Sequence, residues 1–440
     1  MYSDFQKKMD AYLDRYCELS SYSGILRVTL KDKVIYERCM GEANIDTGEM
    51  IKPDSRFNFY SLSKPFCAIG LLKLVDRGLV DLSAHPSKYT PWAEGFDARV
   101  TIDSMLRHTS GMPDYSQLPE GTKNVDSRDA LRESVDMLKT LPMNFAPYEG
   151  VLYSNINFTL SASIIEQVSG MAYADYMQKE VFEPLGMKTA VVNRVGLKIP
   201  DHVSGHDING EKTVTVTRYG VSWMLGAGDI VGTVDDVYCL NRAIKHRLLL
   251  KPETWEKVLT PLENSTFGYG CAVSLWHGKE RIQHNGGSTG FRTLHIQLPE
   301  DDFDLILLSN RGYGNSRGTI SEAAWRAFYG DMKDGASVAA AMDKGYIQDV
   351  TSGAVLDGFL PKLPTAVEMS AEEEAYYLGD YGGQVLSKRD DRYVFTDQNG
   401  RELICFYVGD GLFCNTVIDE GYRITKDAEG YPCFWGKRKA

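Results

Sequence analysis

The sequence predicts an α+β protein in which one antiparallel sheet is flanked by helices and followed by a small antiparallel β domain. Three observations lead to this prediction. Strand-like runs occur near both ends of residues 1–335, a largely helical region separates them, and residues 371–440 alternate aromatic and polar side chains. Segregation of strands from helices along a chain is typical of α+β folds. With 440 residues, 43% of them hydrophobic, the chain can bury a sizeable core.

The N-terminal elements are predicted to be a helix and a hairpin. Apolar residues from Phe5 to Tyr16 recur at helical spacing, which indicates an amphipathic helix. The next stretch, GILRVTLKDKVIYERCMGEAN, alternates apolar and polar residues around a turn at 31–33, which predicts two strands. Because charges run through the first residues, they do not fit a secretory signal. We therefore expect a cytoplasmic protein, unless a signal peptide preceded the present Met1.

A buried helix is expected next. The run SLSKPFCAIGLLKLVDR, which starts at Ser61, is apolar on nearly every side until Gly78 ends it, so this helix should lie inside a domain. Pro65 is tolerated near its start, where a missing N–H leaves no hydrogen bond unmade. Further helices are expected at 101–107, 128–140, 157–169, 172–182 and 233–246.

Strands are expected to resume near residue 281. RIQHNGGSTGFRTLHIQLP and DFDLILLSN are two β-rich runs, and a helix should follow them at 319–329. Residues 336–370 are interrupted by Gly, Ala, Pro and Asp, which indicates a linker with room for one helix. The chain is thus expected to form a large domain over residues 1–335, this linker and a small domain over 371–440.

The small C-terminal domain is predicted to be a meander of hairpins. Its aromatic and polar residues alternate, and turn-forming pairs separate the runs, at Asn399-Gly400 and Asp410-Gly411. Its aromatic side chains are expected to form its own core rather than a ligand pocket.

Charge, hydropathy and cysteine usage argue against several classes of protein. A formal net charge of −12 without a long Lys/Arg run should repel phosphate backbones, so nucleic acid is not an expected partner. No run reaches transmembrane length, so no membrane partner is expected. The eight cysteines are scattered, and the pair His202 and His206 stands in a polar stretch that we expect to be a loop, so neither a metal nor another cofactor is expected.

Ser61 and Lys64 carry the first candidate chemistry. They stand three residues apart at the start of the buried helix, so one turn places both side chains on the same face. A serine hydroxyl needs an adjacent base to act as a nucleophile, and a buried lysine at a helix N-terminus loses proton affinity and can be that base. The alternative is a helix cap beside a lysine that extends to solvent. This is the only Ser-x-x-Lys in the chain.

Five segments resemble, in the same order, the class C β-lactamase and penicillin-binding-protein-like family of serine hydrolases. They are FNFYSLSKPF around Ser61, MLRHTSGMPDY at 105–115, YSN at 153–155, LGAGDIVGTVDDV at 225–237 and HNGGSTGF at 284–291. The resemblance covers roughly residues 20–330 and implies a β-lactamase-like sandwich. Residues 371–440 resemble the lipocalin-like domain of many relatives, which is expected to border or cover the active-site cleft or to mediate self-association.

The resemblance implies roles for the first and third of these segments. Ser61 would form the acyl-enzyme, and Lys64 together with the Tyr153 phenol would transfer its proton to the leaving group. Asn155 would orient Lys64 or the substrate amide. A buried aromatic with a capping hydroxyl is the alternative interpretation of Tyr153.

The last segment would line the site, and the backbone N–H of Gly287 would join that of Ser61 in an oxyanion hole. The residues concerned are His284, Asn285, Gly286 and Gly287. The same stretch matches Gly-x-Ser-x-Gly with Ser288 at its centre, but a nucleophile elbow needs a helix after it, and FRTLHIQLP continues as a strand.

His284 stands where many β-lactamases and cell-wall peptidases have a lysine. A histidine near its reference pKa is mostly neutral at pH 7, so recognition of a substrate carboxylate should weaken. Relatives with His-x-Gly are typically esterases, D-aminopeptidases, amidases and peptide-processing or cyclising enzymes. Three arginines could hold a substrate carboxylate instead: Arg292, Arg311 and Arg317. The alternative interpretation is that these side chains are solvated.

The leading hypothesis is therefore a serine hydrolase that attacks amide or ester bonds of small peptides or amino-acid derivatives, with selectivity for D-residues as an option. A carboxylesterase and a peptide transacylase or cyclase are the alternatives within the family. A non-catalytic binding or scaffold protein is the alternative from another class. The expected partner is a small-molecule or peptide substrate, and a homo-oligomer remains open.

Overall fold

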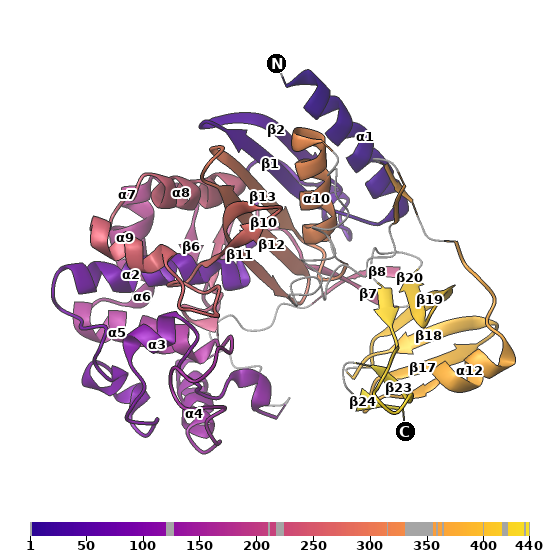
Figure 1. Ribbon diagram of the computed structural model, residues 1–440. Coiled ribbons are helices and arrows are strands. Elements are labelled where there is room, and N and C mark those ends of the chain that lie inside the picture. Colours follow the sequence, from indigo (N-terminus) through magenta and orange to yellow (C-terminus); the bar gives the residue numbers. More distant parts are fainter. Residues whose placement is uncertain are drawn as a thin grey trace.

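The computed structural model describes residues 2–119, 127–209, 212–216, 224–314, 316–330, 355–357, 360–362, 365–398, 400–415, 421–434 and 437–439. Figure 1 shows a central sheet with helices on both faces and a second β-rich region beside it. The six strands of the central sheet are antiparallel and run in the order β10-β11-β12-β13-β1-β2. They are β1 (Gly24–Leu30), β2 (Lys33–Met40), β10 (Ala272–Trp276), β11 (Lys279–Ser288), β12 (Phe291–Leu298) and β13 (Phe303–Ser309).

Strands from distant parts of the chain meet at the centre of this sheet. β1 pairs with β13, with Gly24 opposite Ser309 and Leu30 opposite Phe303. This pairing confirms the predicted α+β class, in which early and late strands flank a helical middle. β10 was not predicted, because strands were expected to resume only near residue 281.

The two faces of the sheet belong to different apolar clusters. Leu305 and Leu307 share a cluster with α1 (Ser3–Leu19) and α10 (Ser316–Tyr329). Ile306 and Leu308 share the other cluster with α2 (Lys64–Asp76). Because neighbouring residues of a strand point to opposite faces, β13 separates an α1/α10 face from an α2 face. Figure 1 shows α1 and α10 together on one side of the sheet and α2 on the other.

The helical middle of the chain follows the predicted order. It contains α3 (Ile102–Leu106), α4 (Arg128–Leu138), α5 (Ile156–Ser169), α6 (Tyr173–Met177), α7 (Glu183–Leu185), α8 (Val234–Lys245) and α9 (Pro252–Leu259). α9 was not predicted. The single helix expected at 172–182 is interrupted, since a π-helical turn at Gln178–Phe182 separates α6 from α7. No helix in these described ranges combines the length and the apolarity needed to cross a bilayer.

Short strands tie the helical region to the sheet. They are β3 (Glu42–Asn44), β4 (Glu49–Met50), β5 (Phe57–Asn58), β6 (Val191–Val192), β7 (His206–Asn209), β8 (Lys212–Thr215) and β9 (Ile230–Gly232). The expected polar loop at His202 and His206 was wrong in part, since His206 is buried and begins the β7–β8 hairpin. Its alternating pattern is only four residues long on each side, too short to distinguish from a loop.

The C-terminal region folds as a meander, as its alternation predicts. α12 (Ala371–Tyr377) precedes a six-stranded antiparallel sheet whose strands follow chain order. They are β16 (Gly379–Asp380), β17 (Val385–Arg389), β18 (Arg392–Thr396), β19 (Glu402–Gly409), β20 (Leu412–Asn415) and β21 (Gly421–Arg423), and β22 (Thr425–Lys426), β23 (Pro432–Phe434) and β24 (Lys437–Arg438) form a second small sheet. The Asp410-Gly411 turn has both residues at positive φ, 47° and 72°, as a tight hairpin requires. Asn399 of the other predicted turn lies outside the described residues.

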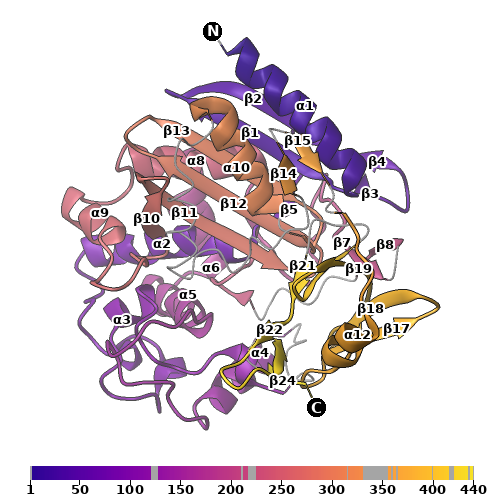
Figure 2. The same cartoon turned by 45° about the vertical axis from the view of Figure 1, so that its right-hand side comes forward.

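The C-terminal sheet is in contact with the first region through the β7–β8 hairpin. Ile208 and Tyr313 belong to the same apolar cluster as Phe413 and other residues of the C-terminal sheet. Arg401 also donates a hydrogen bond of 3.0 Å to Asp207. Figure 2 shows β7 and β8 between the central sheet and β19. Within the predicted linker, β14 (Val355–Asp357) and β15 (Leu360–Lys362) form a hairpin, and most of 336–364 lies outside the described residues.

Candidate active site

Ser61 lies in a short 3₁₀ turn, η1 (Tyr60–Ser63), which connects β5 to α2. The preceding Tyr60 has a φ of 48°, in the left-handed region that bulky residues rarely adopt. Backbone contacts hold this conformation. The Phe59 N–H donates to Ile230 O at 2.9 Å, and Phe59 O accepts a 2.9 Å hydrogen bond from Thr293 Oγ1. The half-buried Ser61 hydroxyl is therefore presented at the start of a buried helix.

Lys64 is fully buried and its Nζ has three polar neighbours. Nζ lies 3.1 Å from Ser61 Oγ, 2.9 Å from Asn155 Oδ1 and 2.7 Å from Ala227 O. Burial lowers the pKa of Lys64 from 10.5 to about 7, although the Asp114 carboxylate opposes this shift. A neutral Lys64 can donate to Asn155 and Ala227 and still accept the proton of Ser61 with its lone pair. This arrangement is the one that a serine nucleophile and its base require.

Tyr153 lies beside this pair. Its ring centroid is 4.7 Å from Lys64 Nζ, and the ring stacks on His108 with centroids 4.5 Å apart. Burial raises the pKa of the Tyr153 phenol, and the nearby Ser61 hydroxyl lowers it only in part. The phenol therefore keeps its proton and can act as a donor. His108 has a structural contact, since its Nδ1 accepts the Ser154 N–H at 3.0 Å.

Asp114 is a residue whose contribution the sequence did not reveal. Its carboxylate accepts hydrogen bonds from the Asn155 backbone N–H, from Asn155 Nδ2 at 3.3 Å and from Ser154 Oγ at 3.3 Å. The contact with Nδ2 turns the Asn155 carbonyl oxygen towards Lys64. Asp114 lies inside the segment MLRHTSGMPDY, which carries part of the family resemblance, but its contact with a residue 41 positions away does not follow from spacing.

The strand β11 runs next to the η1 turn and has an open edge. β10 pairs with β11 only as far as Gln283, so from His284 to Ser288 the edge facing away from β12 is paired with no described strand. A Cβ on Gly286 would lie 2.0 Å from Phe59 O, so only glycine permits this approach. The backbone of β11 is thus held against the turn that carries Ser61.

Replacing Gly286 by alanine should push β11 away from η1. We expect at least a tenfold loss of acylation rate and a lower melting temperature, because overpacking typically costs about 1–3 kcal/mol. Gly287→Ala is the matched control, since the three atoms nearest to its Cβ would belong to the flexible Arg292 side chain, the nearest at 3.3 Å. Thermal unfolding and acylation kinetics check both variants. Equal melting temperatures and equal acylation rates in the two variants would contradict the close contact at Gly286.

His284 is buried and neutral in this site. Its Nδ1 lies 2.6 Å from Asn285 O, and because a carbonyl can only accept, Nδ1 carries the proton and Nε2 the lone pair. Burial lowers the pKa of His284 to about 3, so the ring does not carry a positive charge near neutral pH. Its ring lies 6.3 Å from that of Tyr153, and Nε2 is buried without a hydrogen bond to any described residue. The Asn285 side chain is exposed.

The three candidate arginines lie in different places. Arg317 Nη1 donates to Gly286 O at 3.2 Å, and Arg292 Nη1 donates to Ser288 O at 3.1 Å. Both are therefore next to the open part of β11. Arg311 follows β13 and lines a cavity with Tyr16 and neighbouring residues of the α1 side. The structure does not bring Arg311 into contact with the Ser61 group.

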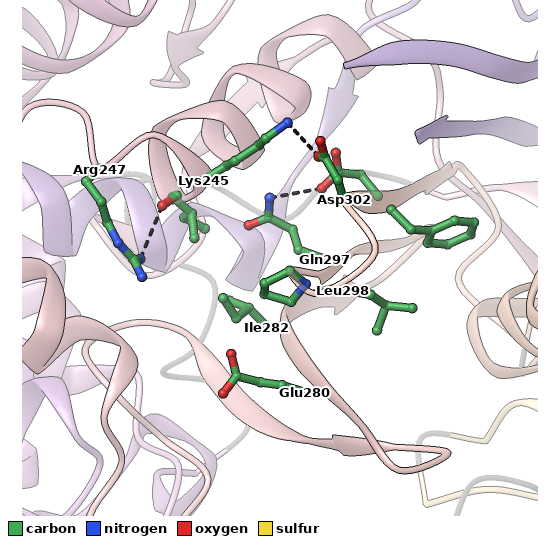
Figure 3. A pocket seen from close by; sticks show the side chains of 11 residues that line it. Lys245, Arg247, Glu280, Ile282, Gln297, Leu298 and Asp302 are labelled. Atoms are coloured by element: carbon green, nitrogen blue, oxygen red, sulfur yellow. Dashed lines mark hydrogen bonds and ion pairs between the residues drawn. The ribbon is translucent and has the colours of Figure 1, made fainter. Parts of the chain in front are cut away.

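A separate pocket of about 160 Å³ lies at the other end of β11 (Figure 3). It is lined by residues from the end of α8, the start of β11 and the β12–β13 turn, including Lys245, Arg247, Glu280, Gln297 and Asp302. Lys245 is paired with Asp302, and Gln297 donates to Asp304 at 2.9 Å. None of the predicted site residues lines this pocket, so it is distinct from the Ser61 group.

Comparisons with known proteins identify relatives of this chain. A family model described as Beta-lactamase matches residues 7–328. Penicillin-binding protein 4* of Bacillus subtilis is 28% identical over 404 residues, which cover 86% of this chain and 88% of that protein. The structure of a D-stereospecific amidohydrolase from Streptomyces sp. superposes with a TM-score of 0.63 at 21% identity, over 76% of this chain and 100% of that one. The structure of SurE covers 100% of this chain and 99% of its own, with a TM-score of 0.61 and 19% identity.

Proposed function

The chain belongs to the β-lactamase family, with homologues among the penicillin-binding-protein-like serine hydrolases, and on this premise we propose that it cleaves amide or ester bonds through an acyl-enzyme on Ser61. The observation that carries the proposal is the contact of Ser61 Oγ with a buried Lys64 whose pKa is lowered to about 7. A nucleophile and a base poised near neutral pH are what acyl transfer needs.

The reaction begins with proton transfer from Ser61 Oγ to the neutral amine of Lys64. Oγ then forms a bond with the substrate carbonyl carbon, and the oxyanion accepts hydrogen bonds from the N–H groups of Ser61 and Gly287. The Tyr153 phenol donates a proton to the leaving nitrogen or oxygen and is reprotonated from Lys64. Water, activated by the same amine, completes hydrolysis, whereas an amine in its place gives transacylation or cyclisation.

The substrate class follows from the charge and the open edge of the site. A neutral His284 supplies no positive charge for a carboxylate, so the site favours a substrate that is uncharged next to the scissile bond. The unpaired edge of β11 offers backbone groups to an extended acyl chain. Small peptides and amino-acid amides or esters meet both conditions. The shared fold with a D-stereospecific amidohydrolase supports including D-residues among them.

The test compares matched D- and L-amino-acid amides and esters with a peptide whose leaving group carries a free carboxylate. We expect turnover of an amide or ester and weak turnover of the carboxylate substrate. His284→Lys should shift the ratio of kcat/KM at least ~10-fold towards the carboxylate substrate, because it adds a positive charge at the strand edge. His284→Asn, which stays neutral, is the control. A protein that neither turns over nor is acylated by any member of the panel would overturn the proposal.

A further inference from the structure

Arg311 is a buried cation with no counter-ion among the described residues. Its side chain is 4% exposed, and its Nε and Nη1 atoms are buried without a hydrogen-bond partner. Burial lowers the pKa of the guanidinium, and Tyr313 and Glu42 oppose this shift only in part. Glu42 makes no ion pair with Arg311. A buried charge without a partner is strongly destabilising. Such a group in a folded protein calls for an unseen partner.

The surroundings of Arg311 offer hydrogen-bond donors around a small cavity of about 10 Å³. Ser316 also lines this cavity, is 2% exposed, and has an Oγ without a partner. Ser316 is the first residue of the 14-residue helix α10, whose N-terminus carries a partial positive charge. The helix end, the hydroxyl and the guanidinium thus contribute positive potential to one space. The remaining walls include Tyr16 and Ser20 of the α1 end.

We propose that this cavity binds a small monatomic anion such as chloride, between the Arg311 guanidinium and the N-terminus of α10. The volume admits about one water-sized particle, which suits a halide and excludes sulfate, phosphate and carboxylate ligands. A water molecule could satisfy the N–H groups but would leave the charge uncompensated. The site lies on the α1/α10 face of the sheet, so its occupant is not the substrate of Ser61.

Bound there, the anion links three parts of the chain. The cavity walls come from the end of α1, from the residues after β13 and from the start of α10. An anion that binds only the folded protein stabilises it. We expect the melting temperature in sodium gluconate to rise saturably, by about 2–4 °C, as gluconate is replaced by chloride or bromide at constant ionic strength. Crystals soaked in bromide should show an anomalous peak beside Arg311.

Two variants separate a bound anion from general salt effects. Arg311→Met should lose the halide response and, in gluconate, should melt at or above the temperature of the wild type, because it no longer buries an unpaired charge. Arg247→Met is the control, since Arg247 is exposed and its removal should leave the halide response intact. Sulfate is a further control, because it stabilises proteins by exclusion from their surface. Any rise in melting temperature that it causes should be equal in the wild type and in both variants.

The outcomes decide the proposal. A wild type whose melting temperature is independent of halide, with no bromide peak, would mean that only water occupies the cavity and would overturn it. An Arg311→Met variant that is less stable in gluconate and in chloride alike would assign Arg311 a packing role and overturn it too. If this variant does not fold, the bromide peak in the wild type decides.

Discussion

Replacing Ser61 by alanine is expected to lower the turnover of every accepted amide or ester by at least ~10⁴-fold, because removal of a nucleophile leaves only binding and oxyanion stabilisation. The change removes one hydroxyl, which lies 3.1 Å from Lys64 Nζ, so the fold should persist. Intact-protein mass spectrometry after exposure to a fluorophosphonate or a D-amino-acid ester checks the prediction. The wild type should gain the mass of the acyl or phosphonyl group and Ser61→Ala should not.

Ser63→Ala is the matched control from the same turn. Ser63 is fully buried and its Oγ accepts the Ile230 N–H at 3.0 Å, so it holds β9 against η1 and does not face the substrate. This variant should lose stability but keep the covalent label. Labelling of Ser61→Ala at the wild-type rate would place the nucleophile elsewhere. A folded wild type that takes no label would favour the non-catalytic binding protein.

Local patterns explain how much of the fold was predictable. The run from Phe66 to Val75 is apolar on nearly every side, and it forms a helix buried between the sheet and α5. The first hairpin was predicted from its alternation, and the strands β11 to β13 from two β-rich runs. Elements with weak local signals were missed, among them the five-residue β10, the eight-residue α9 and the four-residue strands of the β7–β8 hairpin. β10 depends on pairing with β11, and such tertiary contacts leave little trace in a short segment.

Contacts within the candidate site were predictable where the reactive residues lie close together in the sequence at a fixed spacing. Ser61 and Lys64 share one helical turn, so their contact follows from the sequence alone. Tyr153 and His284 came only from the family resemblance, because no spacing brings residues so far apart into one site. Asp114 and the Ala227 carbonyl escaped notice for the same reason, and a backbone carbonyl has no sequence signature at all.

The orientation of Arg311 could not be predicted from the sequence, because it lies just after the end of β13. The side chains of Leu307 and Ser309 point to the same side of β13. Arg311 is two positions after Ser309, so it would point to that side only if the strand continued. The strand ends at Ser309, so orientation beyond it depends on contacts such as that of the Gly312 N–H with His206 O at 2.8 Å. The resemblance grouped the three arginines as possible carboxylate contacts, whereas the fold places Arg292 and Arg317 beside β11 and Arg311 at the end of α1.

Lys64→Met is expected to lower the rate of acylation at least ~10³-fold while leaving the protein folded, because methionine keeps the length of the side chain and removes only the base. In the wild type, the acylation rate should rise as pH increases through about 7, since the protonated amine below the pKa of Lys64 cannot accept the Ser61 proton. Lys64→Met should lack this rise. Stopped-flow acylation with an activated ester between pH 5 and pH 9, a range spanning about two units on either side of that pKa, measures both.

Asp229 makes this pH profile a sharper test, because burial raises its pKa to about 7 as well. The Asp229 carboxylate raises the pKa of Lys64, so Asp229→Asn should move the rise in acylation rate to lower pH without abolishing it. Asparagine can still accept the Gly226 N–H that Asp229 accepts at 2.9 Å, so the loop should hold its shape. A rise that survives in Lys64→Met and disappears in Asp229→Asn would assign the titration to Asp229. A rise that disappears in Lys64→Met and survives in Asp229→Asn identifies the Lys64 amine as the base that activates Ser61.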